Sequence, residues 1–149
     1  MLRGIRGRYP AKIDEKFRLR LPAMCRRLLP ETEENTYFVT SADGSCAKIY
    51  PIPVWEQIER KIKEAPQMEP AIEILDRNYD YYGNYAEMDP QGRILIPQKL
   101  REKAQLDGDV LVMGKHDHLV VWNEQKVDKA VEENPLTYEH RKRLAELGI

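Results

Sequence analysis

The chain has 149 residues, of which 42% are hydrophobic and 33% are charged, and its formal net charge is −1. The length and the hydrophobic content exclude wholesale disorder and allow one ordinary domain or two small ones. A net charge near zero argues against a nucleic-acid partner, but residues 1–29 carry +7 and residues 30–149 carry −8. Such a basic pole directs a polyanion to one face of an acidic protein, although a solvated charged end without a partner would have the same composition.

The amino-terminal residues and the cysteines indicate the compartment. No apolar run precedes the first arginines, so we expect no signal peptide, and no stretch approaches the length that spans a membrane. Cys25 and Cys46 lack CxxC spacing, which fits core positions in a reducing cytoplasm better than a disulfide framework. We therefore expect a cytoplasmic protein without a membrane partner.

Two copies of one twelve-residue segment organise the sequence. AKIDEKFRLRLP at residues 11–22 aligns without a gap with AEMDPQGRILIP at residues 86–97. Both copies have the form apolar-Asp-x-x-x-Arg-apolar-x-apolar-Pro. Four identical residues and three matched apolar positions at one constant offset indicate a duplicated module.

Each repeat contains a predicted tight turn. An Asp at the start of a turn accepts hydrogen bonds from backbone N–H groups two or three residues later, which is the expected role of Asp14 and Asp89. Gly92 can adopt positive φ before Arg93, whereas the first copy has Phe17 at this place, so its turn must differ or tolerate strain. A second interpretation is that each Asp and the following Arg form a salt bridge that only stabilises the turn.

The rest of each copy follows a common plan. Pro22 and Pro97 end the strands and open short helices, whose basic residues Arg26, Arg27 and Arg101 are expected to face solvent. Hydrophobic patterns then predict buried strands and longer helices. The expected elements are strands at 36–40, 49–50, 110–113 and 120–122, helices at 55–65, 66–85 and 123–134, and a tail after residue 135 that is helical or frayed.

Basic residues of the first copy form the predicted nucleic-acid surface. Alternation over residues 18–21 places Arg18 and Arg20 on one strand face, where they can bind phosphates or base edges. Arg93 lies in a nearly neutral neighbourhood, so the first copy is expected to dominate binding. The predicted DNA-binding residues are Arg3, Arg6, Arg8, Lys12, Lys16, Arg18, Arg20, Arg26 and Arg27, and the predicted structural turn residues are Asp14, Asp89, Gly92 and Arg93.

An enzyme has little support in this sequence. His116 and His118 could supply half of a metal site, with Asp117 nearby, but no third ligand has suitable spacing, and a polar hairpin turn explains these residues better. The sequence contains no P-loop, nucleophile elbow or paired-cysteine pattern. Asp14 and Asp89 each have a nearby Arg that would keep them ionised and poorly suited to proton transfer. We expect no catalytic residue, no metal, no cofactor and no small-molecule substrate.

The duplicated turn, strand and proline resemble the SpoVT/AbrB fold, and two copies in a chain of this length resemble the MraZ family. The opening LRG, residues 46–62 (CAKIYPIPVWEQIERKI) and residues 120–124 (VVWNE) are similar to family segments outside the turns. The resemblance covers residues 1–133. It implies an α+β fold, mainly a β core with short helices, in which tandem modules form an intramolecular pseudo-dimeric, β-barrel-like domain. The implied divisions are a first module at 8–54, a helical connector at 55–82, a second module at 83–126 and a C-terminal helical tail at 127–149.

The resemblance also implies a function. It implies a sequence-specific DNA-binding transcriptional regulator, in particular a repressor, that binds repeated short boxes of double-stranded DNA upstream of its own division and cell-wall operon. It further implies a ring-like homo-oligomer that associates with the nucleoid. The alternative is an antitoxin-like module of the same fold that binds a partner protein as well as DNA, and the short amphipathic tail favours the regulator. Phe17, in place of the family's glycine, departs from the pattern and leaves the geometry of the first turn open.

Overall fold

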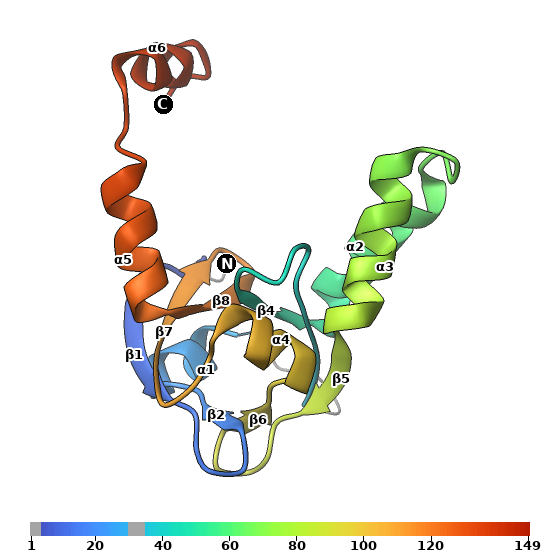
Figure 1. The fold of residues 1–149 in the computed structure, drawn as a ribbon, viewed down its shortest axis with the longest axis vertical. Helices are drawn as coiled ribbons and strands as arrows, with labels where there is room; N and C mark the ends of the chain where they lie inside the picture. The colour runs from blue at the N-terminus through green and yellow to red at the C-terminus, as the bar shows by residue number, and fades with distance from the viewer. Residues whose placement is uncertain (1–3, 30–34) are drawn as a thin grey trace.

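The computed structural model describes residues 4–29 and 35–149 and has an α+β architecture (Figure 1). Every strand and helix that the hydrophobic pattern predicts is present, and the tail after residue 135 is helical. The elements are β1 (Arg8–Lys12), β2 (Arg18–Arg20), α1 (Ala23–Leu28), β3 (Thr36–Thr40), β4 (Ala47–Pro51), α2 (Ile52–Glu64), α3 (Pro70–Tyr82), β5 (Asn84–Glu87), β6 (Arg93–Leu95), α4 (Gln98–Ala104), β7 (Asp109–Lys115), β8 (His118–Asn123), α5 (Glu124–Glu133) and α6 (Tyr138–Glu146).

Strands from the two copies are interleaved in the main sheet. Six strands pair in the order β1-β7-β8-β4-β3-β5, and all the pairs are antiparallel. The first strand of each copy therefore pairs with the other copy, β1 with β7 and β5 with β3, so the two copies are interlocked. This order has approximate two-fold symmetry about the β4–β8 pair. The sheet is open, with β1 and β5 at its edges, and the expected barrel-like closure is not confirmed.

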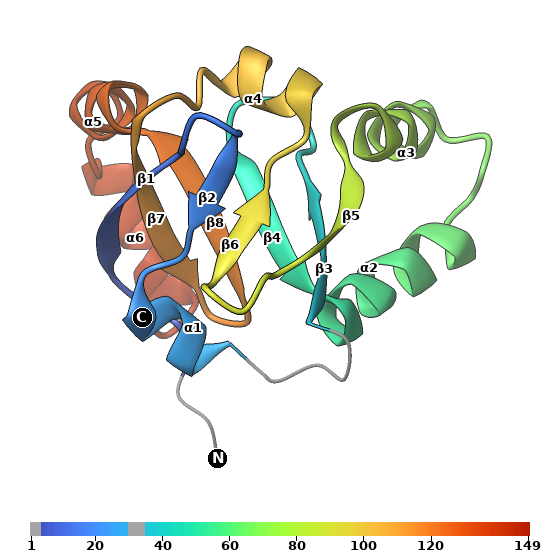
Figure 2. The ribbon, with the colours of Figure 1, turned by 90° about the horizontal axis from the view of Figure 1, so that it is seen from below.

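The two repeats meet in a second, smaller sheet. β2 and β6 form an antiparallel two-stranded ribbon, in which Leu19 lies opposite Ile94 and Arg20 lies opposite Arg93. Figure 2 shows this ribbon lying across one face of the main sheet, with α4 beyond one end and α1 near the other. The longer helices α2, α3 and α5 extend from the opposite side of the molecule (Figure 1).

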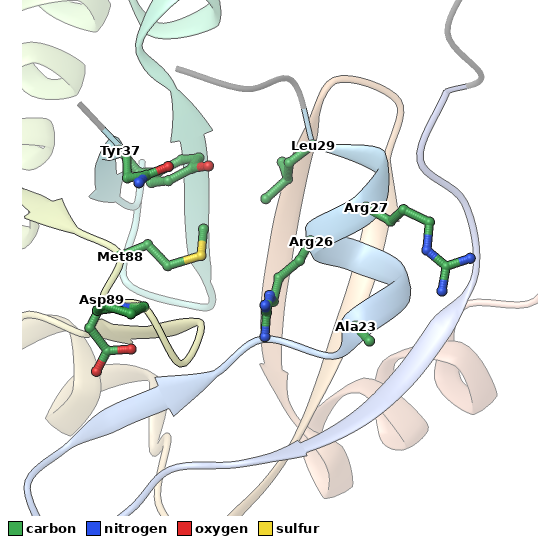
Figure 3. Close-up of a pocket in the computed structure, with 9 residues that line it drawn as sticks. Ala23, Arg26, Arg27, Leu29, Tyr37, Met88 and Asp89 are labelled. Atoms are coloured by element: carbon green, nitrogen blue, oxygen red, sulfur yellow. The ribbon is translucent and has the colours of Figure 1, made fainter. Parts of the chain in front are cut away.

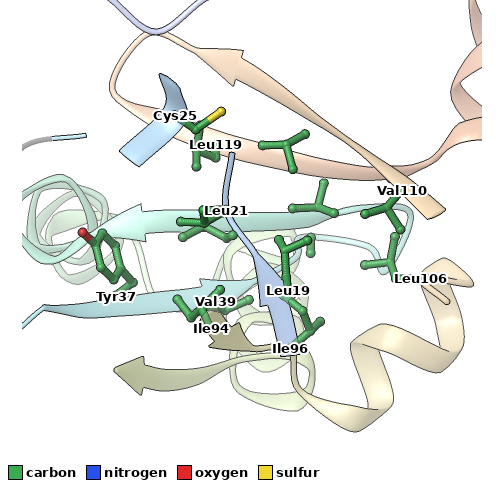
Figure 4. Close-up of a cluster of buried hydrophobic side chains, with 14 of the residues drawn as sticks. Leu19, Leu21, Cys25, Tyr37, Val39, Ile94, Ile96, Leu106, Val110 and Leu119 are labelled. Carbon is green, nitrogen blue, oxygen red and sulfur yellow. The ribbon is translucent and has the colours of Figure 1, made fainter. Parts of the chain in front are cut away.

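The main hydrophobic core lies between the ribbon and the six-stranded sheet. Leu19 and Ile94 are completely buried, and Leu21 and Ile96 are nearly so, because alternation along each short strand turns them away from solvent. Figure 4 shows these side chains beside residues of the main sheet and of α1, including Cys25. Cys25 and Cys46 are both buried and free, as their spacing predicted.

The ends of the longer helices follow from their sequences. Pro51 precedes α2, whose Trp55 packs with Phe38 and Tyr50 in a second hydrophobic cluster. At the start of α5, the side chain of Asn123 accepts a hydrogen bond from the backbone N–H of Lys126. α6 begins with a capping box but has no buried residue, so it projects from the rest of the chain.

Replacing Leu19 with Ala should destabilise the fold by about 2–5 kcal/mol, because the substitution leaves a cavity between ribbon and sheet. Leu95 belongs to the same ribbon but is 54% exposed. Leu95→Ala is therefore the matched control and should change stability by about 0.5 kcal/mol or less. Chemical denaturation of both variants measures the difference. Equal losses would contradict the placement of the core on one face of the ribbon.

Candidate nucleic-acid interface

The two Asp turns have the same hydrogen bonds. In the first turn, Oδ1 of Asp14 accepts from the backbone N–H groups of Lys16 at 2.9 Å and Arg18 at 3.0 Å. In the second turn, Oδ1 of Asp89 accepts from the backbone N–H groups of Gln91 and Arg93, both at 2.9 Å. The prediction that each Asp binds the backbone of its own turn is confirmed.

Each Asp also binds the side chain of the Arg that follows it. Nε of Arg18 lies 2.9 Å from Oδ2 of Asp14, and Nε of Arg93 lies 2.6 Å from Oδ2 of Asp89. The backbone N–H of the Arg is the largest cause that lowers the pKa of each carboxyl, and the guanidinium lowers it further. Both turns therefore hold a carboxylate and a guanidinium in one fixed arrangement. The salt bridge expected in each turn is therefore confirmed, and a role of the two arginines in binding a ligand stays a prediction.

Phe17 adopts the conformation that glycine adopts in the second turn. Its φ is 66°, and that of Gly92 is 78°, so the first turn keeps the geometry and tolerates the strain of a side chain in the left-handed region. The carbonyl of Gly92 accepts from Leu21, and that of Phe17 accepts from Ile96, across the ribbon. The departure from the family glycine therefore leaves the backbone of the turn unchanged.

The short helices pack against the turns of the opposite copy. The guanidinium of Arg101 on α4 lies over the Phe17 ring, 3.6 Å from its centroid, in a cation–π contact. At the equivalent place Arg26 on α1 faces the second turn, and its Nη1 donates to the carbonyl of Gln91 at 3.4 Å. Figure 3 shows Arg26 on the side of α1 that faces Asp89, in a cavity of about 440 Å³.

Arg101 is therefore not the solvent-facing residue that the sequence suggested, since its Nε is buried and has no hydrogen-bond partner. The sequence repeat contained a signal that Arg101 contacts a turn. The constant offset that aligns the two copies also relates Arg26 to Arg101, although the sequence does not show which turn each helix touches.

Three arginines lie on the outward face of the ribbon. Leu19 and Ile94 point into the core, so alternation turns Arg18, Arg20 and Arg93 outward. Arg20 is exposed and lies directly opposite Arg93, while Arg18 lies opposite Leu95. Arg93 thus shares a surface with the basic residues of the first copy. Its neighbourhood in sequence is nearly neutral, and sequence proximity did not reveal the pairing of the two repeats. The expectation that the first copy dominates binding stays a prediction.

The structure separates the other predicted basic residues into two groups. Lys16 is exposed in the first turn, and Arg26 and Arg27 are exposed on α1, so these three flank the ribbon. Arg6, Arg8 and Lys12 belong to the β1 edge, and they do not join the ribbon. Tyr9 and Ala11 pack against the main core, so the alternating Arg8 and Lys12 face the other side, where Arg8 binds Glu124 at 3.3 Å and Lys12 lies 3.8 Å from Asp109. Arg3 lies outside the described residues.

The KHDH segment forms the β7–β8 hairpin. Nδ1 of His118 lies 2.8 Å from Oδ1 of Asp117, and the His118 ring packs on Tyr50. His116 occupies the turn, with φ 66°. In residues 4–29 and 35–149, no group of three His, Cys, Asp or Glu side chains is placed to hold a metal ion. Across the same residues, no helix has the length and apolar character needed to cross a membrane.

Replacing both Asp14 and Asp89 with Asn should reduce the dependence of stability on acid pH. The folded state lowers the pKa of both carboxyls, so their stabilisation is present above the unfolded pKa of about 3.9 and is lost as pH falls through the folded pKa. The double variant should be less stable than the parent at about pH 7, and the gap should narrow towards about pH 3. Urea midpoints at both pH values measure this, with exposed Asp107→Asn as the control. If the difference in stability between parent and double variant were the same at both pH values, the two carboxyls would not cause the pH dependence.

Known proteins with similar sequences are consistent with this geometry. The family model described as "MraZ protein, putative antitoxin-like" matches residues 5–78 and 84–146. A protein of Acidobacterium capsulatum named transcriptional regulator MraZ is 46% identical over 145 residues, which are 97% of this chain and 99% of the relative. Proteins with the same name from Koribacter versatilis and Thiobacillus denitrificans are 41% and 33% identical, over 97% and 85% of this chain and 99% and 85% of their own length. With its two matched, interlocked copies, this chain belongs to the MraZ family.

Proposed function

We propose that this chain is a sequence-specific DNA-binding transcriptional regulator and that the β2–β6 ribbon reads the DNA. The main support for this proposal is that the two repeats pair so that Arg18, Arg20 and Arg93 lie on one outward face of the ribbon. The major groove of B-DNA admits a two-stranded β-ribbon, and arginine is the side chain that most often reads guanine there. Relatives that match nearly the whole chain are named transcriptional regulators, which supports the same conclusion.

The three arginines have different roles in this proposal. The side chain of Arg20 has no hydrogen bond to another described residue and is exposed, so its full set of donors is available to a base edge or a phosphate. Arg18 and Arg93 are each oriented by an Asp that occupies only part of the guanidinium. A guanidinium has five N–H donors, and those that remain can reach DNA from a fixed position. Lys16 and Arg26 beside the ribbon supply further phosphate contacts.

We further propose that the protein is a repressor and binds repeated short boxes upstream of its own division and cell-wall operon, in the cytoplasm and at the nucleoid. One ribbon spans only a short stretch of DNA, so several copies joined in a ring-like homo-oligomer would gain affinity by binding several boxes at once. The exposed edges of the main sheet at β1 and β5 support self-association, because unpaired strand edges readily pair with other chains.

An antitoxin-like module that also binds a partner protein is the second candidate. The family description contains the term antitoxin-like, and α6 presents exposed Tyr138 and is flanked by exposed Leu136 and Leu147 without packing on the rest of the chain. Copurification of a small toxic protein with the chain would favour this candidate over the regulator.

Arg20→Ala should weaken specific DNA binding by about 5–150-fold per engaged chain, the equivalent of about 1–3 kcal/mol for one lost base or phosphate contact. A gel shift with the chain's own upstream region, against scrambled DNA of equal length, measures this. Arg60→Ala, at an exposed position on α2 away from the ribbon, is the control and should bind normally. Arg93→Ala should also weaken binding, with circular dichroism used to confirm that the turn remains folded. Normal specific binding by Arg20→Ala would exclude the ribbon as the reading element.

Binding should depend steeply on salt, since each neutralised phosphate adds about 0.9 to the slope of log affinity against log salt. Lys16→Ala should reduce the slope by about one if Lys16 contacts a phosphate. Fluorescence anisotropy over a salt series gives both slopes, and light scattering in the same buffers shows whether the assembly is intact. A slope near zero for the parent protein would remove DNA from its partners.

A further inference from the structure

A basic cavity lies on the other face of the main sheet. It has a volume of about 490 Å³ and is bounded by the β3–β4 loop, residues 41–46, and by strands β4, β7 and β8. In Figure 1 this loop, drawn in teal, rises between α5 and α2, on the side of the sheet away from the ribbon. The pairing of Lys48 with Val120 and of Val120 with Met113 puts these three side chains in one row across the floor of the cavity.

The lining has a cationic part and an apolar part. Arg6, Lys48 and Lys115 supply the positive charge. Lys115 lies opposite His118 at the hairpin end of β7 and β8, and Trp122 lies at the other end of β8. These two lining residues are seven positions apart in sequence, yet the hairpin places them on one face of the sheet. A ligand that fits this lining has an anionic end and a flat or apolar body.

The protein balances only part of the positive charge of the cavity. Asp43 is the acidic residue in the lining, and its Oδ1 already accepts hydrogen bonds from the backbone N–H and the hydroxyl of Ser45, at 2.9 and 2.7 Å. Within the described part of the chain, the side chains of Arg6, Lys48 and Lys115 form no hydrogen bond and no ion pair. Arg8, one strand position away from the cavity, is paired with Glu124. Three cations against one carboxylate leave an excess of positive charge around one concave site, which favours an anion.

His118 lies beside the cavity and interacts electrostatically with two of its lysines. Its Nε2 is buried and has no hydrogen-bond partner, and burial is the main cause that lowers its pKa. Asp117 opposes this effect and raises the pKa, and Lys48 and Lys115 lower it by smaller amounts. An anion bound between the two lysines would remove their contribution, so His118 is a natural reporter of occupancy.

We propose that this cavity binds a small organic phosphate, with the phosphate held by Arg6, Lys48 and Lys115 and the body of the ligand packed on Val120 and Trp122. The volume lies in the usual range for small-molecule sites, about 300–1,000 Å³. Phosphate is the anion that several converging cationic donors hold best. DNA on the ribbon cannot supply this phosphate, because the main sheet lies between ribbon and cavity. The proposal does not depend on DNA binding, and its test uses no DNA.

Calorimetric titration of the full chain with AMP, inorganic phosphate and adenosine measures how much the cationic part and the apolar part of the cavity each contribute to affinity. AMP should bind more tightly than phosphate or adenosine, because it alone has both the dianion and the ring. Lys48→Gln and Lys115→Gln should each weaken AMP binding by about tenfold or more, the usual effect of losing one charge-assisted hydrogen bond. Lys142→Gln on exposed α6 makes the same change of charge away from the cavity and should bind AMP as the parent does.

Three further measurements, by NMR, circular dichroism and light scattering, test the same proposal. NMR of the His118 ring should show its pKa rise when AMP is added, and this rise should disappear in Lys48→Gln. Circular dichroism of Lys48→Gln and Lys115→Gln checks that weaker binding is not a loss of fold. Absence of binding at millimolar AMP and phosphate would overturn the proposal. Equal binding by Lys115→Gln and Lys142→Gln would also overturn it, as would a fall in oligomer mass in Lys115→Gln, which would assign the cavity to contacts between copies.

Discussion

The pairing of β2 with β6 is the constraint on which the rest of the structure depends. Each strand has only three residues, and an isolated short strand or two-stranded hairpin is marginal in water. Their pairing brings Leu19 and Ile94 together over the main sheet and closes the core. The same pairing determines which residues face outward. Neither repeat can therefore form its part of the surface without the other.

The outward face has an electrostatic cost that the two turns offset. Like charges directly opposite each other on paired strands are destabilising, and Arg20 lies opposite Arg93. Asp89 binds Arg93 and Asp14 binds Arg18, so two of the three guanidinium groups have a carboxylate within hydrogen-bonding distance. Each carboxylate is in turn held by two backbone N–H groups. The two turns thus stabilise the basic ribbon when no polyanion is bound. They also leave some N–H donors of the guanidinium groups free to bind a polyanion.

The sequence was sufficient to predict the local elements and the turns but not the contacts between the copies. The Asp14 and Asp89 turns, the alternation of Leu19 and Leu21 and the helix that contains Trp55 all follow from patterns a few residues long. The position of Arg93 depends on which strands pair across the duplication, which no local pattern encodes. The contact of Arg101 with Phe17 also joins one copy's helix to the other copy's turn. The conformation of Phe17 depends on hydrogen bonds of the whole turn, which override its preference for negative φ.

The two faces of the main sheet differ in how closely the copies match. On the ribbon side, the turns share their hydrogen bonds, their φ values and their packing against a short helix, because β2 and β6 must pair with each other. On the other side the copies differ: β3 and β4 are joined by a raised six-residue loop, whereas β7 and β8 are joined by a tight turn at His116 and Asp117. The β3–β4 loop forms a wall of the cavity, and the β7–β8 turn forms no equivalent wall on the other side of the approximate two-fold axis. Mutual pairing requires the ribbon face to remain symmetric, whereas no strand pairing imposes this requirement on the opposite face, where a separate binding site can form.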